Sequence, residues 1–112
     1  MLILSMLVNL VVLIPLCASL LREAPSMDAV FGPATPARGI LTAIYLTFAA
    51  ASIVVLASLG VPELSEAIAV PLLSAQVIYK LATWPLVGIR NVVVRFNLAI
   101  AILHAATLVT LL

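Results

Sequence analysis

The charged residues of this chain gather in its connecting segments and leave four long uncharged stretches between them. Only nine of the 112 residues are charged, five basic and four acidic. An apolar stretch of about 20 residues can cross a bilayer as one helix. Lipid admits only helices and closed barrels, because every backbone polar group must bond within the protein. The spacing therefore predicts an all-α fold, an integral membrane antiparallel four-helix bundle in which residues 1–112 form one transmembrane domain. The predicted spans are about 2–21, 39–59, 63–84 and 92–112.

The composition excludes several classes of protein. Hydrophobic residues make up 66% of the chain and charged residues 8%, whereas about 25% of residues are charged in soluble globular domains. With a net charge of +1 and no run of basic residues, the chain has no surface for nucleic acid. The one cysteine, Cys17, excludes an internal disulfide, and its apolar surroundings indicate a small buried side chain.

The positions of the basic residues predict how the chain is oriented. All five flank the first or the third connector: Arg22 and Arg38, then Lys80, Arg90 and Arg95. The second connector has none and carries Glu63 and Glu66 instead. Because lysine and arginine are enriched in cytoplasmic loops, both termini are predicted to lie on the non-cytoplasmic side. The first apolar stretch lacks a basic leading segment, so we expect a retained membrane helix rather than a cleaved signal.

The third predicted span is the shortest in uncharged residues, with only 67–79 free of charge. It can still cross if it begins near Pro62 and if Lys80 extends its amine to the membrane surface. Tyr79 and Trp84 are then expected at the interface, and Pro85 is expected to end the helix. The alternative is a re-entrant segment that enters and leaves on one side.

Two local features of the other segments lead to further expectations. In the first connector, residues 26–31 could form one interfacial turn, with Met27, Val30 and Phe31 facing lipid and Asp28 facing water. Asn91 is a plausible cap for the last helix. The second span is rich in small residues near helical spacing, and we expect it to be the most tightly packed helix because small side chains let helices approach closely in lipid. Those residues are Ala43, Thr47, Ala50, Ala51 and Ser58.

Six polar or ionisable side chains are predicted at membrane depth and form the candidate ligand-binding set. They are Tyr45, Gln76, Tyr79, Lys80, Asn97 and His104. Such groups are costly in lipid and often mark a functional site, here a polar cleft open to the cytoplasm. The competing hypothesis is interhelical hydrogen bonding, with Asn9 or Gln76 bonding across helices and His104 satisfied by one of them.

No catalytic or metal motif accompanies this set. The chain has one histidine and one cysteine and therefore no zinc-ligand cluster, and its serine, histidine and aspartate residues show no hydrolase arrangement. His104 alone could serve as an axial ligand for a haem or a pigment, an alternative that the sequence leaves open. We therefore predict no catalytic residue, no metal, no cofactor and no enzymatic activity.

Several segments resemble uncharacterised small four-helix bacterial inner-membrane proteins. The resemblance rests on the motifs Pro36–Leu41, Ile44–Tyr45, Tyr79–Thr83, Val87–Gly88, Asn91–Val94, Asn97–Ile100, His104 and Thr107–Leu108. It covers most of the chain and implies a four-helix protein of a bacterial inner membrane. It implies no activity.

Two functions from different classes fit these expectations. The first is a non-enzymatic accessory or structural subunit that packs its helices against partner membrane subunits or against copies of itself. The second is a binder or transporter of a lipid, a quinone or another small molecule through the cytoplasm-facing cleft. Membrane lipids are expected partners in both cases, and nucleic acid in neither.

Overall fold

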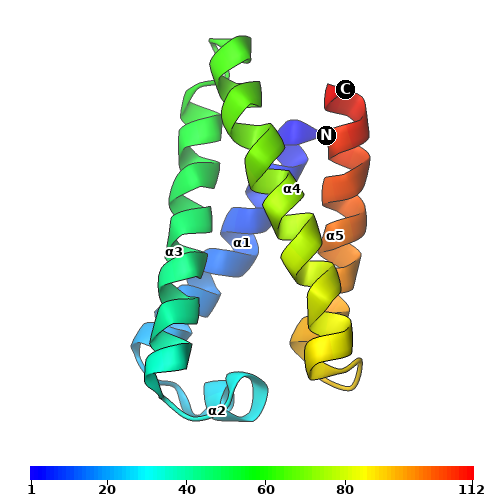
Figure 1. Ribbon diagram of the computed structural model, residues 1–112. Coiled ribbons are helices and arrows are strands. Elements are labelled where there is room, and N and C mark those ends of the chain that lie inside the picture. The colour runs from blue at the N-terminus through cyan, green and yellow to red at the C-terminus, as the bar shows by residue number, and fades with distance from the viewer.

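The computed structural model describes residues 1–112 and is entirely helical. Four of its helices are long and apolar enough to cross a membrane. They run alternately down and up, with both termini at the upper end and the short helix α2 at the lower end (Figure 1). The five helices are α1 (Leu2–Leu21), α2 (Pro25–Phe31), α3 (Pro36–Ala57), α4 (Pro62–Val87) and α5 (Val92–Leu111).

Local residues mark the start of three of the five helices. Asn91 caps α5 by accepting a hydrogen bond from the Val93 N–H at 2.9 Å, which confirms the predicted cap. Thr35 caps α3 by accepting from the Arg38 N–H at 3.4 Å. Pro62 stands at the first turn of α4, where its missing N–H costs nothing.

The prediction that Pro85 ends the third long helix is wrong. The helix α4 continues through Pro85 to Val87 and ends at Gly88, whose φ of 108° is a conformation that favours glycine. Proline removes a bond to the preceding turn and does not by itself stop the residues that follow it. The helix therefore has 26 residues, more than the 20 or so that a span needs.

The end of α1 carries the one non-glycine residue with positive φ, Glu23 at 53°. The Ala24 N–H donates to Ser19 O at 3.0 Å, and the Glu23 N–H donates to Leu20 O at 3.1 Å. These two bonds make a Schellman motif, in which glycine is the usual residue at the position of Glu23. The motif turns the chain sharply from α1 into α2.

The short helix α2 turns its apolar side inward, which corrects the expectation that this side faces lipid. Met27 and Phe31 pack against the lower ends of α1 and α3, and the Phe31 ring meets the Tyr45 ring edge-on with centroids 6.0 Å apart. Arg38 holds the segment in place by donating to Asp28 Oδ1 at 2.6 Å and to Gly32 O at 2.8 Å. Asn91 Nδ2 donates to Val30 O at 2.9 Å and ties α2 to the start of α5.

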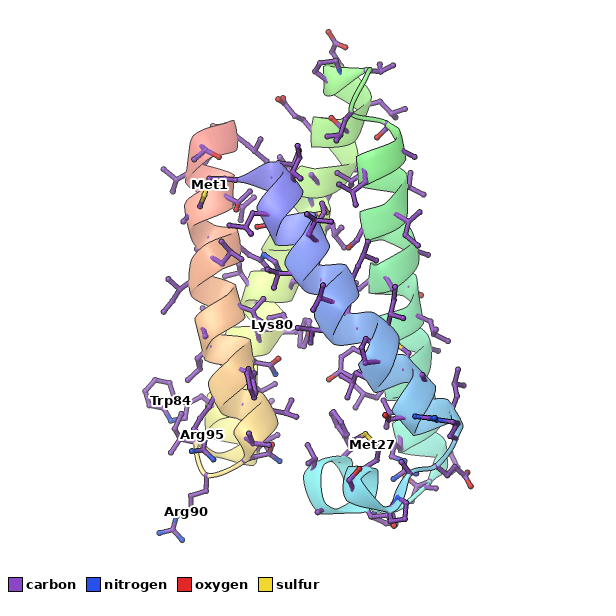
Figure 2. The ribbon with its side chains drawn as sticks, turned by 180° about the vertical axis from the view of Figure 1, so that it is seen from behind. Met1, Met27, Lys80, Trp84, Arg90 and Arg95 are labelled. Atoms are coloured by element: carbon purple, nitrogen blue, oxygen red, sulfur yellow. The ribbon has the colours of Figure 1, made fainter.

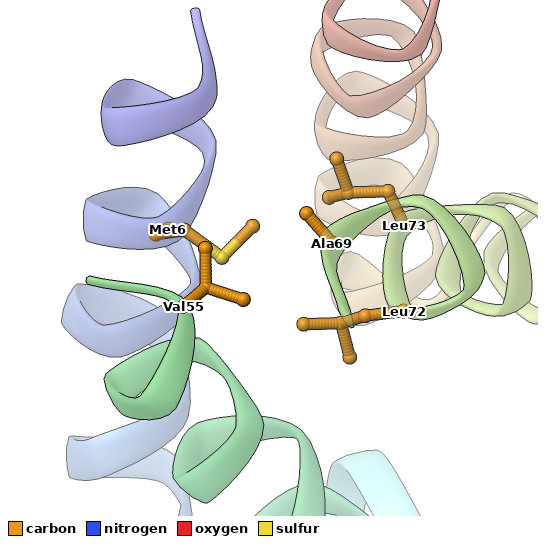
Figure 3. Close-up of a cluster of buried hydrophobic side chains, with 5 residues drawn as sticks. All are labelled: Met6, Val55, Ala69, Leu72 and Leu73. Carbon is orange, nitrogen blue, oxygen red and sulfur yellow. The ribbon is translucent and has the colours of Figure 1, made fainter. Parts of the chain in front are cut away.

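The long helices pack most extensively as two pairs, α1 with α3 and α4 with α5. The helix α1 crosses obliquely, meeting α5 near the N-terminus and lying against α3 further down (Figure 2). A buried apolar cluster joins α1, α3 and α4 (Figure 3): Met6, Val55, Ala69, Leu72 and Leu73. A second cluster joins α1 to α3 in the lower half: Leu13, Cys17, Leu20, Tyr45 and Ala49.

Three of the five small residues on which the expected tight packing of α3 rested do not pack within the chain. Ala43, Thr47 and Ala50 are exposed, while Ala51 and Ser58 are half-buried. The buried face of α3 instead carries larger or polar side chains, among them Tyr45 and Ser52. Polar groups cost most when they face lipid, which favours turning this side of the helix inward.

We expect Arg38→Gln to release the α2 segment. The substitution removes the ion pair with Asp28, and a charge-assisted hydrogen bond contributes about 1.5–3 kcal/mol. Phe31 is the one aromatic residue in the connectors and therefore the expected chymotrypsin site. In micelles, chymotrypsin should cut after Phe31 several-fold faster in the variant than in the unaltered protein, because the released segment is easier to reach. Arg22→Gln is the matched control, since Arg22 bonds only to Ala18 O of its own helix. Equal cleavage rates in all three proteins would contradict the role given to Arg38.

Candidate functional site

The structure divides the six predicted site residues into two groups. Gln76 and His104 lie in the upper half, fully buried among side chains from all four long helices. The other four lie together lower down and line one pocket: Tyr45, Tyr79, Lys80 and Asn97. The sequence led us to expect one cleft lined by all six residues. The structure has a buried polar network in the upper half and a separate pocket in the lower half.

The upper group is centred on Asn9 of α1. Its Nδ2 donates to Gln76 Oε1 of α4 at 2.8 Å and to Ser52 Oγ of α3 at 3.1 Å. Its Oδ1 accepts from Gln76 Nε2 at 3.3 Å and bonds to His104 Nε2 of α5 at 2.9 Å. These bonds confirm that Asn9, Gln76 and His104 satisfy one another across helices. One amide thus contacts all three other long helices.

The acceptor at Asn9 fixes the direction of the remaining hydrogen bonds. A carbonyl oxygen only accepts, so His104 Nε2 carries a proton and Nδ1 is the acceptor. Nδ1 then accepts from the Ser5 hydroxyl at 3.2 Å, and Ser5 Oγ accepts from Thr107 Oγ1 at 2.6 Å. We call the set Ser5, Asn9, Ser52, Gln76, His104 and Thr107 the Asn9 network. All its members are buried.

The Asn9 network does not fit the alternative of an axial haem or pigment ligand. Axial ligation needs one ring nitrogen of His104 free and facing an open space. Both ring nitrogens are hydrogen-bonded, and the side chain has no exposed surface. Nor does any group of three histidine, cysteine or acidic side chains come together as a metal site would require.

The lower group surrounds Lys80, which does not extend to the membrane surface as the sequence led us to expect. The residue is 3% exposed, and its amine donates to Asn97 Oδ1 of α5 at 3.1 Å. The amine also lies 5.0 Å from the centroid of the Tyr79 ring, within the range of a cation–π contact. Figure 2 shows Lys80 well above Trp84, Arg90 and Arg95, which gather at the lower end.

No carboxylate accompanies Lys80. The chain has four acidic residues, and the only ion pair is that between Asp28 and Arg38. The other three, Glu23, Glu63 and Glu66, are exposed in the first connector or near the start of α4. The amine of Lys80 is thus a buried basic group whose protein partners are one amide oxygen and one ring face.

Two tyrosines complete the wall around this amine. Tyr79 stacks on Phe48 with ring centroids 5.5 Å apart and planes 16° from parallel. Its hydroxyl is the one buried side-chain polar atom with no hydrogen-bond partner in the protein. Tyr45 is buried beside it and is held from below by Phe31. Of the two residues predicted at the interface, only Trp84 is exposed.

We call the space beside this amine the Lys80 pocket. Its volume is about 280 Å³, and eight of its twelve lining residues are hydrophobic. Its opposite walls are the lower parts of α1 and α5, which diverge there (Figure 2). The α1 wall includes Val12, Leu13, Pro15, Leu16 and Ser19; the α5 wall includes Val93, Phe96, Asn97 and Ile100. A smaller pocket of about 160 Å³ lies on the α2 side and shares four lining residues with it: Tyr45, Tyr79, Val93 and Asn97.

Sequence reasoning missed Ser5, Ser52 and Thr107 of the Asn9 network, and Thr83, whose hydroxyl accepts from Asn97 Nδ2 at 3.4 Å. The hydroxyls of serine and threonine in apolar helices commonly donate to a carbonyl of their own preceding turn, and Ser52 and Thr83 do so here as well. The residue type therefore gives no signal of a tertiary role. The only available sign was position: Ser5 and Asn9 are four apart on α1, as are Gln76 and Lys80 on α4, so each pair shares a helix face.

We expect Asn9→Leu to destabilise the protein by about 2 kcal/mol. An interhelical hydrogen bond in lipid contributes roughly 0.6 kcal/mol, and a buried group left unpaired costs about 1–3 kcal/mol. The reactivity of Cys17, the only thiol and a buried one, reports unfolding in mixed micelles of rising denaturing-detergent fraction. Val11→Leu is the control, because Val11 is 73% exposed. An unchanged midpoint for Asn9→Leu would show that Asn9 does not hold the helices together.

Comparison of the chain with protein-family models, with curated proteins and with solved structures finds no match. What the protein does must therefore be argued from its own side chains, above all from the buried amine of Lys80 and the pocket beside it.

Proposed function

We propose that the protein is a multi-pass protein of a bacterial inner membrane, with its four long helices crossing as an antiparallel bundle. Three features support this: the apolar length of the helices, a long dimension of 41 Å, and the large exposed aliphatic side chains around them. A bilayer with its headgroup regions is about 40–45 Å thick. The bacterial origin rests on the resemblance of the sequence to small inner-membrane proteins.

The proposed orientation has both termini on the non-cytoplasmic side. The lower end of the molecule, around α2, carries Arg22, Arg38, Arg90 and Arg95, whereas the start of α4 at the other end carries Glu63 and Glu66. Basic residues concentrate on the cytoplasmic side of membrane proteins. We therefore assign the α2 end to the cytoplasm.

Thiol labelling of intact cells tests this orientation. In a Cys17→Ala background, Glu63→Cys should react with an impermeant maleimide added outside, and Arg90→Cys should react only after the cells are opened. Both positions are exposed, so a difference between them reports sidedness and not burial. The reverse labelling pattern would overturn the orientation.

We further propose that the protein is not an enzyme and that it binds a small amphipathic molecule of the membrane in the Lys80 pocket. The observation that carries this is the buried amine of Lys80, which has no carboxylate partner. Burying an unpaired charge costs several kcal/mol, and apolar residues of similar volume often stabilise a protein more than buried ions do. A polar group kept at such a cost within membrane helices is by default a functional candidate.

Native mass spectrometry of the protein released from its own membrane in mild detergent tests the binding function. We expect a defined small-molecule mass on the unaltered protein and its loss in Ile100→Phe, because Ile100 lines the pocket and a larger ring fills it. Ile102→Phe is the control, since Ile102 lies two residues away on the same helix and is 72% exposed. If both variants retain the mass equally, or if none is found on any of the three proteins, the proposed function is wrong.

A second function, that of an accessory or structural subunit, is favoured by one observation on α3. Gly39, Ala43, Thr47 and Ala50 are all exposed and follow one face at spacings of four, four and three residues. Small residues at such spacing allow close helix–helix packing in lipid. The same mass spectra separate the two functions. A subunit would be detected in complex with a stoichiometric companion chain or as an oligomer, and Ala50→Leu would disrupt that complex.

A further inference from the structure

We propose that the ligand of the Lys80 pocket is a single-chain amphiphile with a carboxylate head, such as a long-chain fatty acid. Its carboxylate would lie between the Lys80 amine and the Tyr79 hydroxyl, and its chain would leave between α1 and α5 into the bilayer. This inference rests on the proposed binding function and specifies the chemistry of the ligand.

Charge is the first argument for this head group. The Lys80 pocket contains a cationic side chain and no anionic one, since the four acidic side chains lie elsewhere. A ligand anion supplies the missing counter-ion within a low-dielectric site, where the attraction between opposite charges is strong. A neutral quinone would bring acceptor oxygens but would leave the charge of Lys80 unbalanced.

The donors that remain available are the second argument. An ammonium group has three N–H donors, and Asn97 Oδ1 is the one hydrogen-bond acceptor that the protein supplies to Lys80. The Tyr79 hydroxyl is buried without a partner, although buried polar groups are nearly always hydrogen-bonded. A carboxylate only accepts hydrogen bonds, and its two oxygens match these two sets of donors.

Size and depth favour a fatty acid over a phospholipid. The pocket volume of about 280 Å³ stands at the lower end of the range for small-ligand sites, and most of its lining is apolar. Lys80 lies seven residues before the cytoplasmic end of α4, or about 10 Å along the helix. A carboxylic acid can reach this depth because protonation removes its charge. A phosphodiester keeps its charge at physiological pH and stays at the interface.

Binding of tritiated palmitate to the immobilised, detergent-solubilised protein provides the test, with unlabelled palmitate, hexadecanol and palmitoyl lysophosphatidate as competitors. We expect palmitate to bind at least ten-fold more tightly than hexadecanol, which has the same chain without the charge. In Lys80→Met the preference for palmitate should disappear, because the stem is kept and the amine removed. In Tyr79→Phe palmitate should lose roughly three-fold in affinity.

The Lys80→Met variant is expected to fold, since it replaces a buried amine by an apolar group of similar length. Its thermal unfolding midpoint should equal or exceed that of the unaltered protein. A purely structural lysine would instead lower this midpoint and leave the ratio of palmitate to hexadecanol affinity unchanged, which would overturn the proposal.

The remaining outcomes separate this proposal from the function on which it rests. Hexadecanol binding as tightly as palmitate would exclude a carboxylate site, and lysophosphatidate binding ten-fold more tightly would assign a phosphate head instead. If palmitate fails to bind while Ile100→Phe still removes a native mass, only the ligand class is wrong. If Ile100→Phe changes neither palmitate binding nor the native small-molecule mass, both the proposed binding function of the pocket and the proposed ligand are wrong.

Discussion

In the membrane location that we propose, hydrogen bonding without water is the constraint on which the interior of this protein depends. A hydrocarbon environment gives no hydrophobic drive between helices, so packing, small side chains and polar contacts must hold them together. The Asn9 amide meets this requirement in the upper half, with partners on α3, α4 and α5. A leucine there would contact the same helices but would favour no particular register among them.

The two halves of the molecule differ in how completely their polar groups are paired. In the upper half every side-chain nitrogen and oxygen of the Asn9 network has at least one partner at hydrogen-bond distance, and α1 lies against α5. In the lower half α1 diverges from α5 (Figure 2), aromatic rings fill part of the space, and Lys80 and Tyr79 keep unused donors. We infer that the hydrogen bonds of the upper half fix how the helices pack. The unused donors of the lower half remain available to the ligand proposed for the Lys80 pocket.

The sequence predicted the helices well and their faces less well. Charge spacing located the four long helices, and Asn91 and Pro62 marked two of their starts, because these are local effects. The depth of Asn9, Gln76 and His104 predicted their mutual bonding. Whether the Lys80 side chain points inward, and whether the small residues on α3 are exposed, depends on how each helix is rotated about its own axis. That rotation is decided by the summed packing of all four helices, which no single segment encodes.

The place of Asn9 in the chain has a consequence for how the protein is made. Its helix is synthesised first, whereas Gln76 and His104, two of its partners, stand 67 and 95 residues later. When α1 has just been made, the Asn9 amide has no partner from this chain, and His104 is synthesised only with α5. Assembly can begin with α1 and α3, since Ser52 is the first partner of Asn9 to be synthesised. The Asn9 network is complete only when α5 has joined the other three long helices.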